Sequence, residues 1–98
     1  MTWQLRYADA ARKQLGKMDA SARNMILLWM SRNIDGCENP RLHGKALVGN
    51  LKGSWRYRIG DYRVLCEIRD LELVVLAFEM AHRSEVYEKK ARQRKGRR

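Results

Sequence analysis

The sequence predicts an α+β domain in which two N-terminal helices pack on one face of a four-stranded antiparallel sheet, in the order β-α-α-β-β-β. Apolar and polar residues alternate over residues 3–7, which indicates a first strand. Residues 9–34 then carry apolar side chains at helical spacing. Three strand-like runs follow a loop region, and this separation of helices from strands is typical of the α+β class.

Two helices are expected after the first strand, joined as an αα-hairpin. The first begins at Asp9, a suitable N-cap, and runs to about residue 17, with Gly16 weakening its end. The second runs over about residues 20–33, with Asp19 as its N-cap. Its apolar residues recur at i, i+3, i+4 and i+7, so one face of this helix should be buried against the sheet.

Residues 36–53 are expected to form a loop, because they hold the sequence's only proline and four of its seven glycines. Strands are expected at about 54–59, 62–69 and 72–79. The third is the most apolar and is placed in the middle of the sheet. With both helices on one face, the other face of the sheet is left open to a partner.

The stretch WRYRIGDYRV predicts a β-hairpin. Its apolar residues and arginines alternate on both sides of Gly60-Asp61, which has the composition of a two-residue turn. In this register Ile59 lies opposite Tyr62. One face of the hairpin then carries side chains suited to pack under the helices: Trp55, Tyr57, Ile59, Tyr62, Val64 and Cys66.

The opposite face of the hairpin gathers three arginines. Arg58 lies opposite Arg63, Arg56 shares the Arg58 side, and Lys52 lies just before the hairpin. Like charges placed directly opposite each other destabilise a sheet. A bound anion would account for this face, and phosphate suits the planar fork of arginine. The alternative is a solvated face in which the arginine stems cover apolar neighbours.

The net charge of the 98-residue chain is +10, from 21 basic and 11 acidic residues, which indicates a polyanion or an acidic protein as partner. Residues 88–98 hold seven basic residues and one acidic residue. We therefore expect one domain over residues 1–87 and a basic tail over residues 88–98. The tail either adds affinity for polyanions or acts only as a solvated arm.

The sequence gives no sign of export or of a membrane anchor. Its first residues lack a charged-then-apolar leader, and its longest wholly apolar run, residues 25–30, is too short to span a bilayer. Cys37 and Cys66 form no metal or redox motif. We expect a cytoplasmic protein with reduced cysteines, no cofactor and no bound metal.

A second group of polar side chains follows the third strand. His82, Arg83 and Tyr87 bring an imidazole, a guanidinium and a phenol within six residues. Each residue taken alone is more often structural than catalytic. Because this group lies near the sheet that carries the arginines, the two groups could converge on one site.

The run YRIGDYRVLCEI, the approach LHGKALVGNLKGSWRYRI and the later HRSEVY together resemble the RelE/ParE superfamily of bacterial toxins. The resemblance covers nearly the whole chain up to Tyr87 and implies a RelE-like fold. It also implies a toxin of a type II toxin–antitoxin system, neutralised by a cognate acidic antitoxin. RelE-like members are ribosome-dependent mRNA endonucleases, and ParE-like members inhibit DNA gyrase. The RelE-like branch is favoured here.

The resemblance implies roles for individual residues of the endonuclease. Arg63 and Arg83 match the branch's arginines and would contact the scissile phosphate, while Tyr87 matches its tyrosine and would hold a base or move a proton. Arg56 and Arg58 stand where the branch often has lysines, and with Lys52 they would bind the RNA backbone. Arginine does not readily lose its proton. His82 is therefore the candidate general base or acid.

Three functions remain open at this point. The first is a metal-independent mRNA endonuclease that acts on the ribosome, in which the 2′-hydroxyl attacks the scissile phosphate. The second is a gyrase inhibitor, in which His82, Arg83 and Tyr87 would be structural. The third is a general RNA-binding module. In the first case the partners are the ribosome, mRNA and the antitoxin, and DNA is met only through the antitoxin.

Overall fold

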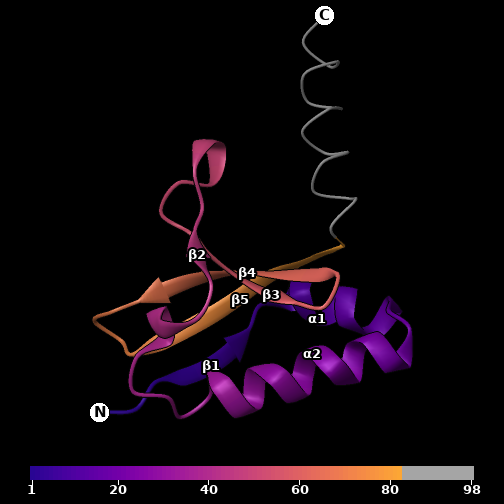
Figure 1. The fold of residues 1–98 in the computed structure, drawn as a ribbon, viewed down its shortest axis with the longest axis horizontal. Helices are drawn as coiled ribbons and strands as arrows, with labels where there is room; N and C mark the ends of the chain where they lie inside the picture. Colours follow the sequence, from indigo (N-terminus) through magenta and orange to yellow (C-terminus); the bar gives the residue numbers. More distant parts are fainter. Residues whose placement is uncertain (83–98) are drawn as a thin grey trace, which may run out of the picture.

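A computed structural model describes residues 1–82 of the chain. Within these residues, two helices cover one face of a five-stranded sheet with the strand order β1-β5-β4-β3-β2 (Figure 1). The predicted α+β class is therefore confirmed. Arg83, Tyr87 and the basic tail lie outside the described residues.

The two helices have nearly the predicted bounds: α1 spans Asp9–Lys17 and α2 spans Ala20–Asn33. Asp19 caps α2 as predicted, because its Oδ2 accepts hydrogen bonds from the backbone N–H groups of the next turn at 3.1 and 3.3 Å. The prediction that Asp9 caps α1 is wrong. The N-cap is Ala8, and Asp9 is the first helical residue, where its negative charge suits the helix dipole.

The sheet within residues 1–82 is built from β1 (Gln4–Tyr7), β2 (Lys45–Ala46), β3 (Trp55–Ile59), β4 (Tyr62–Arg69) and β5 (Val74–His82). Two short 3₁₀ helices, η1 (Pro40–Leu42) and η2 (Gly49–Leu51), interrupt the segment that was expected to be a loop. The predicted bounds of β3, β4 and β5 agree with the observed bounds to within a few residues.

The prediction of a four-stranded antiparallel sheet needs correction. Strand β1 pairs with β5 in parallel, and both helices and strands β2 to β4 lie between these two strands in the sequence. Strand β2 adds a fifth strand, antiparallel to β3, and it is only two residues long. The apolar strand β5 is interior, between β1 and β4, but β4 is the middle strand among the described residues.

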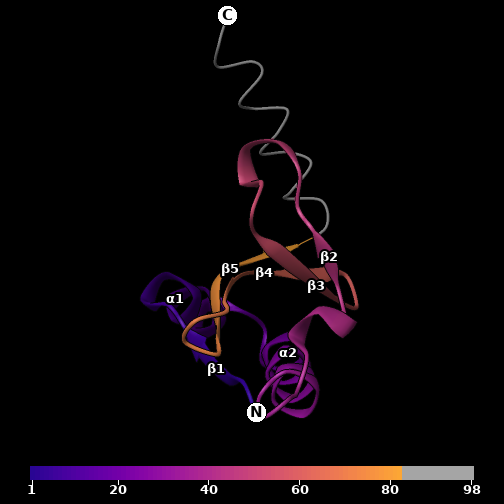
Figure 2. The ribbon, with the colours of Figure 1, turned by 90° about the vertical axis from the view of Figure 1, so that its left-hand side faces the viewer.

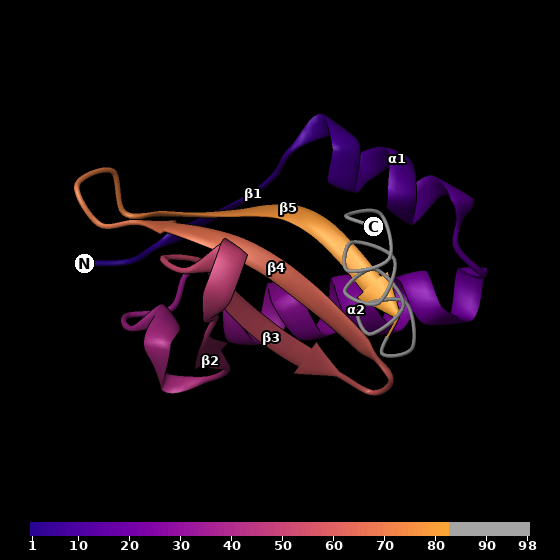
Figure 3. The same ribbon diagram turned by 90° about the horizontal axis from the view of Figure 1, so that it is seen from above.

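The core lies between the sheet and the helices, with α1 packed against β5 and α2 against β3 (Figure 3). Tyr57, Val64 and Cys66 are fully buried there, as predicted for that side of the hairpin. The Tyr57 hydroxyl donates a hydrogen bond of 2.7 Å to the carbonyl oxygen of Pro40. This bond fixes the segment before β2 to the core, and burial raises the pKa of Tyr57.

Candidate nucleic-acid interface

The hairpin of β3 and β4 has the register predicted from its sequence. Ile59 pairs with Tyr62, and Arg58 pairs with Arg63 across the two strands. The turn depends on Gly60, whose φ of +59° lies in the left-handed region that glycine adopts without strain. Because Tyr57 and Val64 point into the core, the arginines that alternate with them point away from the helices.

We call the side chains of Arg56, Arg58 and Arg63 the arginine face. None of the three forms an ion pair with any residue in the range 1–82. Arg63 is only 8% exposed, and its Nε has no hydrogen-bond partner within the described part of the chain. A buried donor without a partner is costly, so this surface is suited to bind an anion.

The far end of the same sheet face shows a different arrangement of charge. Arg69 Nε donates a hydrogen bond of 2.8 Å to Glu67 Oε1 and lies 3.9 Å from a carboxylate oxygen of Glu72. The arginine at that end is thus paired with acidic neighbours, whereas those on the hairpin are not. The difference locates the region of unbalanced positive charge at β3 and the first half of β4.

The structure adds two charged residues that the sequence analysis did not place on this face. Lys45 of β2 pairs with Arg56 and extends the basic surface to the sheet edge. Glu79 of β5 pairs with Leu65, two residues from the Ala81 that pairs with Arg63. Glu79 lies in the most apolar strand, where nothing in the sequence pointed to a site residue. A register shift between Leu65 and Cys66 also prevents the side of the sheet that Glu79 occupies from being predicted by alternation.

His82 does not join the arginine face. It pairs with Tyr62 at the end of β5, and its ring meets the Tyr62 ring edge-on with 5.2 Å between the centroids. Since Tyr62 and Arg63 are consecutive, their side chains point to opposite sides of the sheet. His82 is therefore on the helix-facing side, and the expected convergence with Arg63 is not seen for this residue.

The remaining predicted site residues are distributed as follows. Lys52 is exposed and ends η2, in a segment that projects from the sheet edge rather than on the hairpin itself. Arg83 and Tyr87 lie outside the described residues, so their roles remain predictions. The arginine face and Lys45 are the parts of the site that the described structure brings together.

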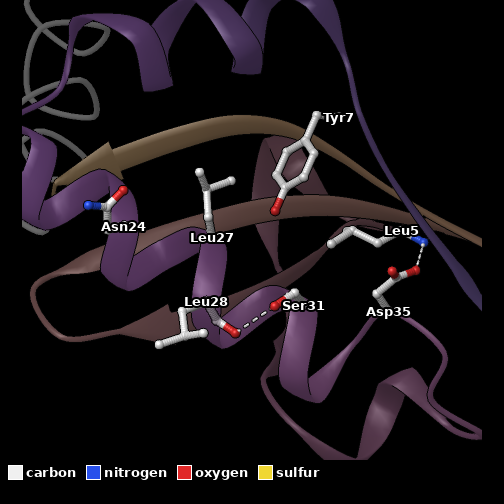
Figure 4. Close-up of a pocket in the computed structure, with 7 residues that line it drawn as sticks. All are labelled: Leu5, Tyr7, Asn24, Leu27, Leu28, Ser31 and Asp35. Carbon is white, nitrogen blue, oxygen red and sulfur yellow. Dashed lines mark hydrogen bonds between the residues drawn. The ribbon is translucent and has the colours of Figure 1, made fainter.

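A separate groove lies on the helix side of the sheet, between β1 and α2 (Figure 4). It has a volume of about 590 Å³ and is mainly apolar, lined by Leu5, Tyr7, Asn24, Leu27, Leu28, Ser31 and Asp35. Asp35 Oδ1 accepts a hydrogen bond of 3.1 Å from the Leu5 N–H. Burial, with smaller effects of Cys66 and Asp35, raises the pKa of Tyr7 to about 12, so the phenol stays protonated.

Comparison with known families identifies this chain as a toxin of a type II toxin–antitoxin system. Residues 5–87 match the family model of the ParE toxin of the type II toxin–antitoxin system parDE. The chain belongs to this family. Among curated proteins, no sequence matches it.

Solved structures support the same fold. The RelBE2 toxin–antitoxin complex from Mycobacterium tuberculosis contains a chain that matches with a TM-score of 0.71 and 26% identity, over 85% of this chain and 93% of that one. The RelE–RelB complex from Pyrococcus horikoshii matches with a TM-score of 0.63 and 22% identity, over 85% and 97%. The isolated RelE toxin from E. coli matches with a TM-score of 0.62 and 21% identity, over 93% and 97%.

Two further findings concern the helices and the cysteines. Neither helix in residues 1–82 has both the length and the apolar character required to cross a bilayer. Cys37 and Cys66 are both free thiols, and burial raises the pKa of Cys66.

Proposed function

We propose that this toxin is a metal-independent endonuclease that cleaves mRNA on the ribosome in the cytoplasm. The observation that carries the proposal is the buried guanidinium of Arg63, which has no acidic partner within residues 1–82 and lies opposite Arg58. Arginine donors in a partly dehydrated site bind phosphate oxygens strongly. Arg56 and Arg58 then hold the RNA backbone on either side of the reacting phosphate.

The chemistry is an in-line transesterification. The 2′-hydroxyl gives up its proton, its oxygen forms a bond to the adjacent phosphorus, and the bond from phosphorus to the 5′-oxygen breaks. The leaving oxygen takes up a proton. Arg63 and Arg83 stabilise the charge that builds up on the phosphate, because oriented donors act most strongly where charge develops. Tyr87 holds a base or relays a proton.

The proton acceptor in this mechanism is a group other than the arginines. Arginines at positions 56 and 58 do not serve as bases, since their guanidinium groups keep their protons. His82 was the candidate from sequence, but it lies on the other side of the sheet from Arg63. Glu79 is a carboxylate on the arginine side, so it is the better placed acceptor of the two.

The comparisons support the antitoxin as a partner. Chains of similar fold occur in complexes whose names pair a RelE toxin with a RelB antitoxin. We propose that the cognate antitoxin presents an acidic, amphipathic segment that covers the arginine face. Opposite charges would speed their association, and the association rate would fall as salt is added.

The direct test is single-turnover cleavage of mRNA on programmed ribosomes. Arg63→Ala should lower the cleavage rate by roughly 10²–10³, the usual cost of losing one donor to a developing charge. Arg83→Ala should have a similar effect. Arg69→Ala is the matched control, because Arg69 lies on the same sheet face but is paired with Glu67. Equal rates for Arg63→Ala and the unchanged toxin would contradict the proposal.

A second function, inhibition of DNA gyrase, is favoured by two observations. The family model that matches residues 5–87 is that of the ParE toxin. In addition, the position directly opposite Arg63 on β5 is Ala81, which has no titratable side chain, and His82 faces the helices. A supercoiling assay with purified gyrase distinguishes the two. Loss of supercoiling without mRNA cleavage would assign the toxin to the gyrase inhibitors.

A further inference from the structure

The segment of residues 45–54, which we call the arm, projects from the edge of the sheet. It begins in β2, passes through η2 and returns to β3. Two views show it rising from the sheet on the side away from α1 and α2 (Figures 1 and 2). The arginines of β3 and β4 point to this same side, so the arm stands beside the arginine face.

The arm is held firmly at its base. Trp55 Nε1 donates a hydrogen bond of 2.7 Å to the carbonyl oxygen of His43. Gly44 has a φ of +80°, and a Cβ there would overlap the carbonyl oxygen of Arg56. The residue at this position must therefore be glycine for the base of the arm to lie against β3.

Backbone hydrogen bonds also order the arm above its base. The Leu47 N–H donates to the Ser54 carbonyl oxygen at 2.9 Å, and the Ser54 N–H donates to the Leu51 carbonyl oxygen at 3.0 Å. These bonds close the arm on itself, so it keeps a defined shape although it projects into solvent. A defined shape reduces the entropy lost when such a segment binds a partner.

The chemistry of the arm is that of a nucleic-acid contact. No acidic residue occurs between Glu38 and Asp61, whereas that stretch holds five basic residues: Arg41, Lys45, Lys52, Arg56 and Arg58. At the tip, Val48 is 80% exposed and Leu51 is 43% exposed. Exposed apolar side chains set among basic ones can contact bases while lysines contact the phosphates.

We propose that the arm and the arginine face are two adjoining surfaces that hold one RNA strand, with Lys45 and Lys52 on its phosphates and Val48 and Leu51 against its bases. The inference rests on the proposed function, because it takes the RNA substrate as given. In this inference the arm takes no part in the chemistry. The arm instead fixes the path along which the RNA strand approaches Arg63. Lys45 links the two surfaces, since it pairs with Arg56.

The test measures binding of a fluorescent single-stranded RNA that carries 2′-O-methyl groups and so cannot be cleaved. The full-length toxin is titrated over a series of salt concentrations. Lys45→Gln and Lys52→Gln should each lower the slope of log affinity against log salt by about 0.7, the value for one phosphate contact on a single strand. The matched controls are Lys13→Gln and Lys17→Gln on α1, which should leave the slope unchanged.

Two further variants separate charge from shape. Val48→Ser with Leu51→Ser should weaken binding at every salt concentration without changing the slope. Gly44→Ala displaces the arm without changing any charge, and it should weaken binding by more than Gly16→Ala, whose Cβ meets nothing within 4 Å. Thermal unfolding of Gly44→Ala checks that the domain still folds. If Gly44→Ala does not fold, the lysine variants and the Val48/Leu51 variant test whether the arm binds RNA.

The outcomes are distinct. Unchanged slopes for both lysine variants, with a reduced slope for Arg56→Gln, would show that RNA crosses the arginine face without touching the arm and would overturn the inference. If the arm variants bound RNA as the unchanged toxin does but no longer bound the antitoxin, the inference would also be overturned, because the arm would then be an antitoxin contact. If the unchanged toxin failed to cleave ribosome-bound mRNA, the proposed function would be overturned. A salt slope that depends on Lys45 and Lys52 would still show that the arm binds RNA.

Discussion

The rings of His82 and Tyr62 meet edge-on, with 5.2 Å between their centroids, at the paired ends of β5 and β4. This contact holds the imidazole on the side of the sheet that faces the helices. The guanidinium of Arg63, one residue from Tyr62, points to the other side. The two groups that the sequence suggested as partners in catalysis are therefore separated by the sheet itself.

The first prediction follows from this separation. His82→Ala should slow cleavage of ribosome-bound mRNA less than Arg63→Ala, because the histidine does not share a face with the arginines. Glu79→Gln should cause a larger loss than His82→Ala and should shift the pH dependence of the cleavage rate. Single-turnover rates over a pH series measure both effects. A loss for His82→Ala that exceeds the loss for Arg63→Ala would identify the histidine as the principal base.

The second prediction concerns the stability of the fold. Arg63 is nearly buried with an unpartnered Nε, so Arg63→Met should raise the free energy of unfolding by roughly 1–3 kcal/mol, the usual cost of an unsatisfied buried donor. Arg58→Met is the control, because Arg58 is exposed and should change stability by less than about 0.5 kcal/mol. Urea denaturation measures both. A destabilised Arg63→Met protein would mean that the guanidinium supports the fold.

The third prediction concerns the ion pair between Arg41 and Asp70. Two hydrogen bonds of 2.8 and 2.9 Å join these side chains, and they lower the pKa of Asp70 below its ordinary value of 3.8. The stabilisation is fully present above the pKa of the unfolded chain and is lost as the pH falls through the lower pKa of the folded protein.

Asp70→Asn should therefore lower the urea midpoint slightly at neutral pH. The difference between the variant and the unchanged protein should disappear in acid below the folded-state pKa of Asp70. Asp61→Asn on the hairpin turn is a suitable control, because Asp61 forms no ion pair with a described residue. A difference that persists in acid would show that the amide disturbs the backbone rather than the ion pair.

The fourth prediction concerns the basic tail. Deletion of residues 89–98 removes seven positive charges, so RNA or ribosome affinity should fall. Its salt dependence should also flatten, by about 0.7 in slope for each phosphate that the tail binds. Cleavage at saturating ribosome should persist, because Arg63, Arg83 and Tyr87 remain. An unchanged slope would mean that the tail binds no phosphate. Failure to cleave at saturation would place the tail in the active site.

The hairpin shows how much of the fold the sequence alone could predict. Alternation with period two and the Gly60-Asp61 turn are local signals, and they fixed the pairing of Arg58 with Arg63 correctly. Strand β2 carries no such signal, because two residues cannot show a period. The parallel pairing of β1 depends on a contact between distant parts of the chain, which a local pattern does not record.

The candidate site divides in the same way. The arginine face follows from the hairpin register, and the absence of acids between residues 39 and 60 would also have pointed to Lys45. The sides of the sheet on which His82 and Glu79 lie could not be predicted by counting alternate residues along the sequence. Phe78 is an extra residue between the pairs of Leu65 and Cys66, so the alternation along β5 changes in the middle of the strand.

The side chain of Gln14 in α1 protects part of β5 from pairing with another molecule at high protein concentration. Its amide donates to the Met80 carbonyl oxygen at 3.0 Å and accepts from the Met80 N–H at 2.7 Å, beyond the point where β1 ends. One side chain thus occupies backbone groups that an intruding strand would need. Unprotected strand edges are starting points for aggregation. Replacement of Gln14 by leucine would leave this part of β5 open to pairing with another molecule, and self-association would begin there.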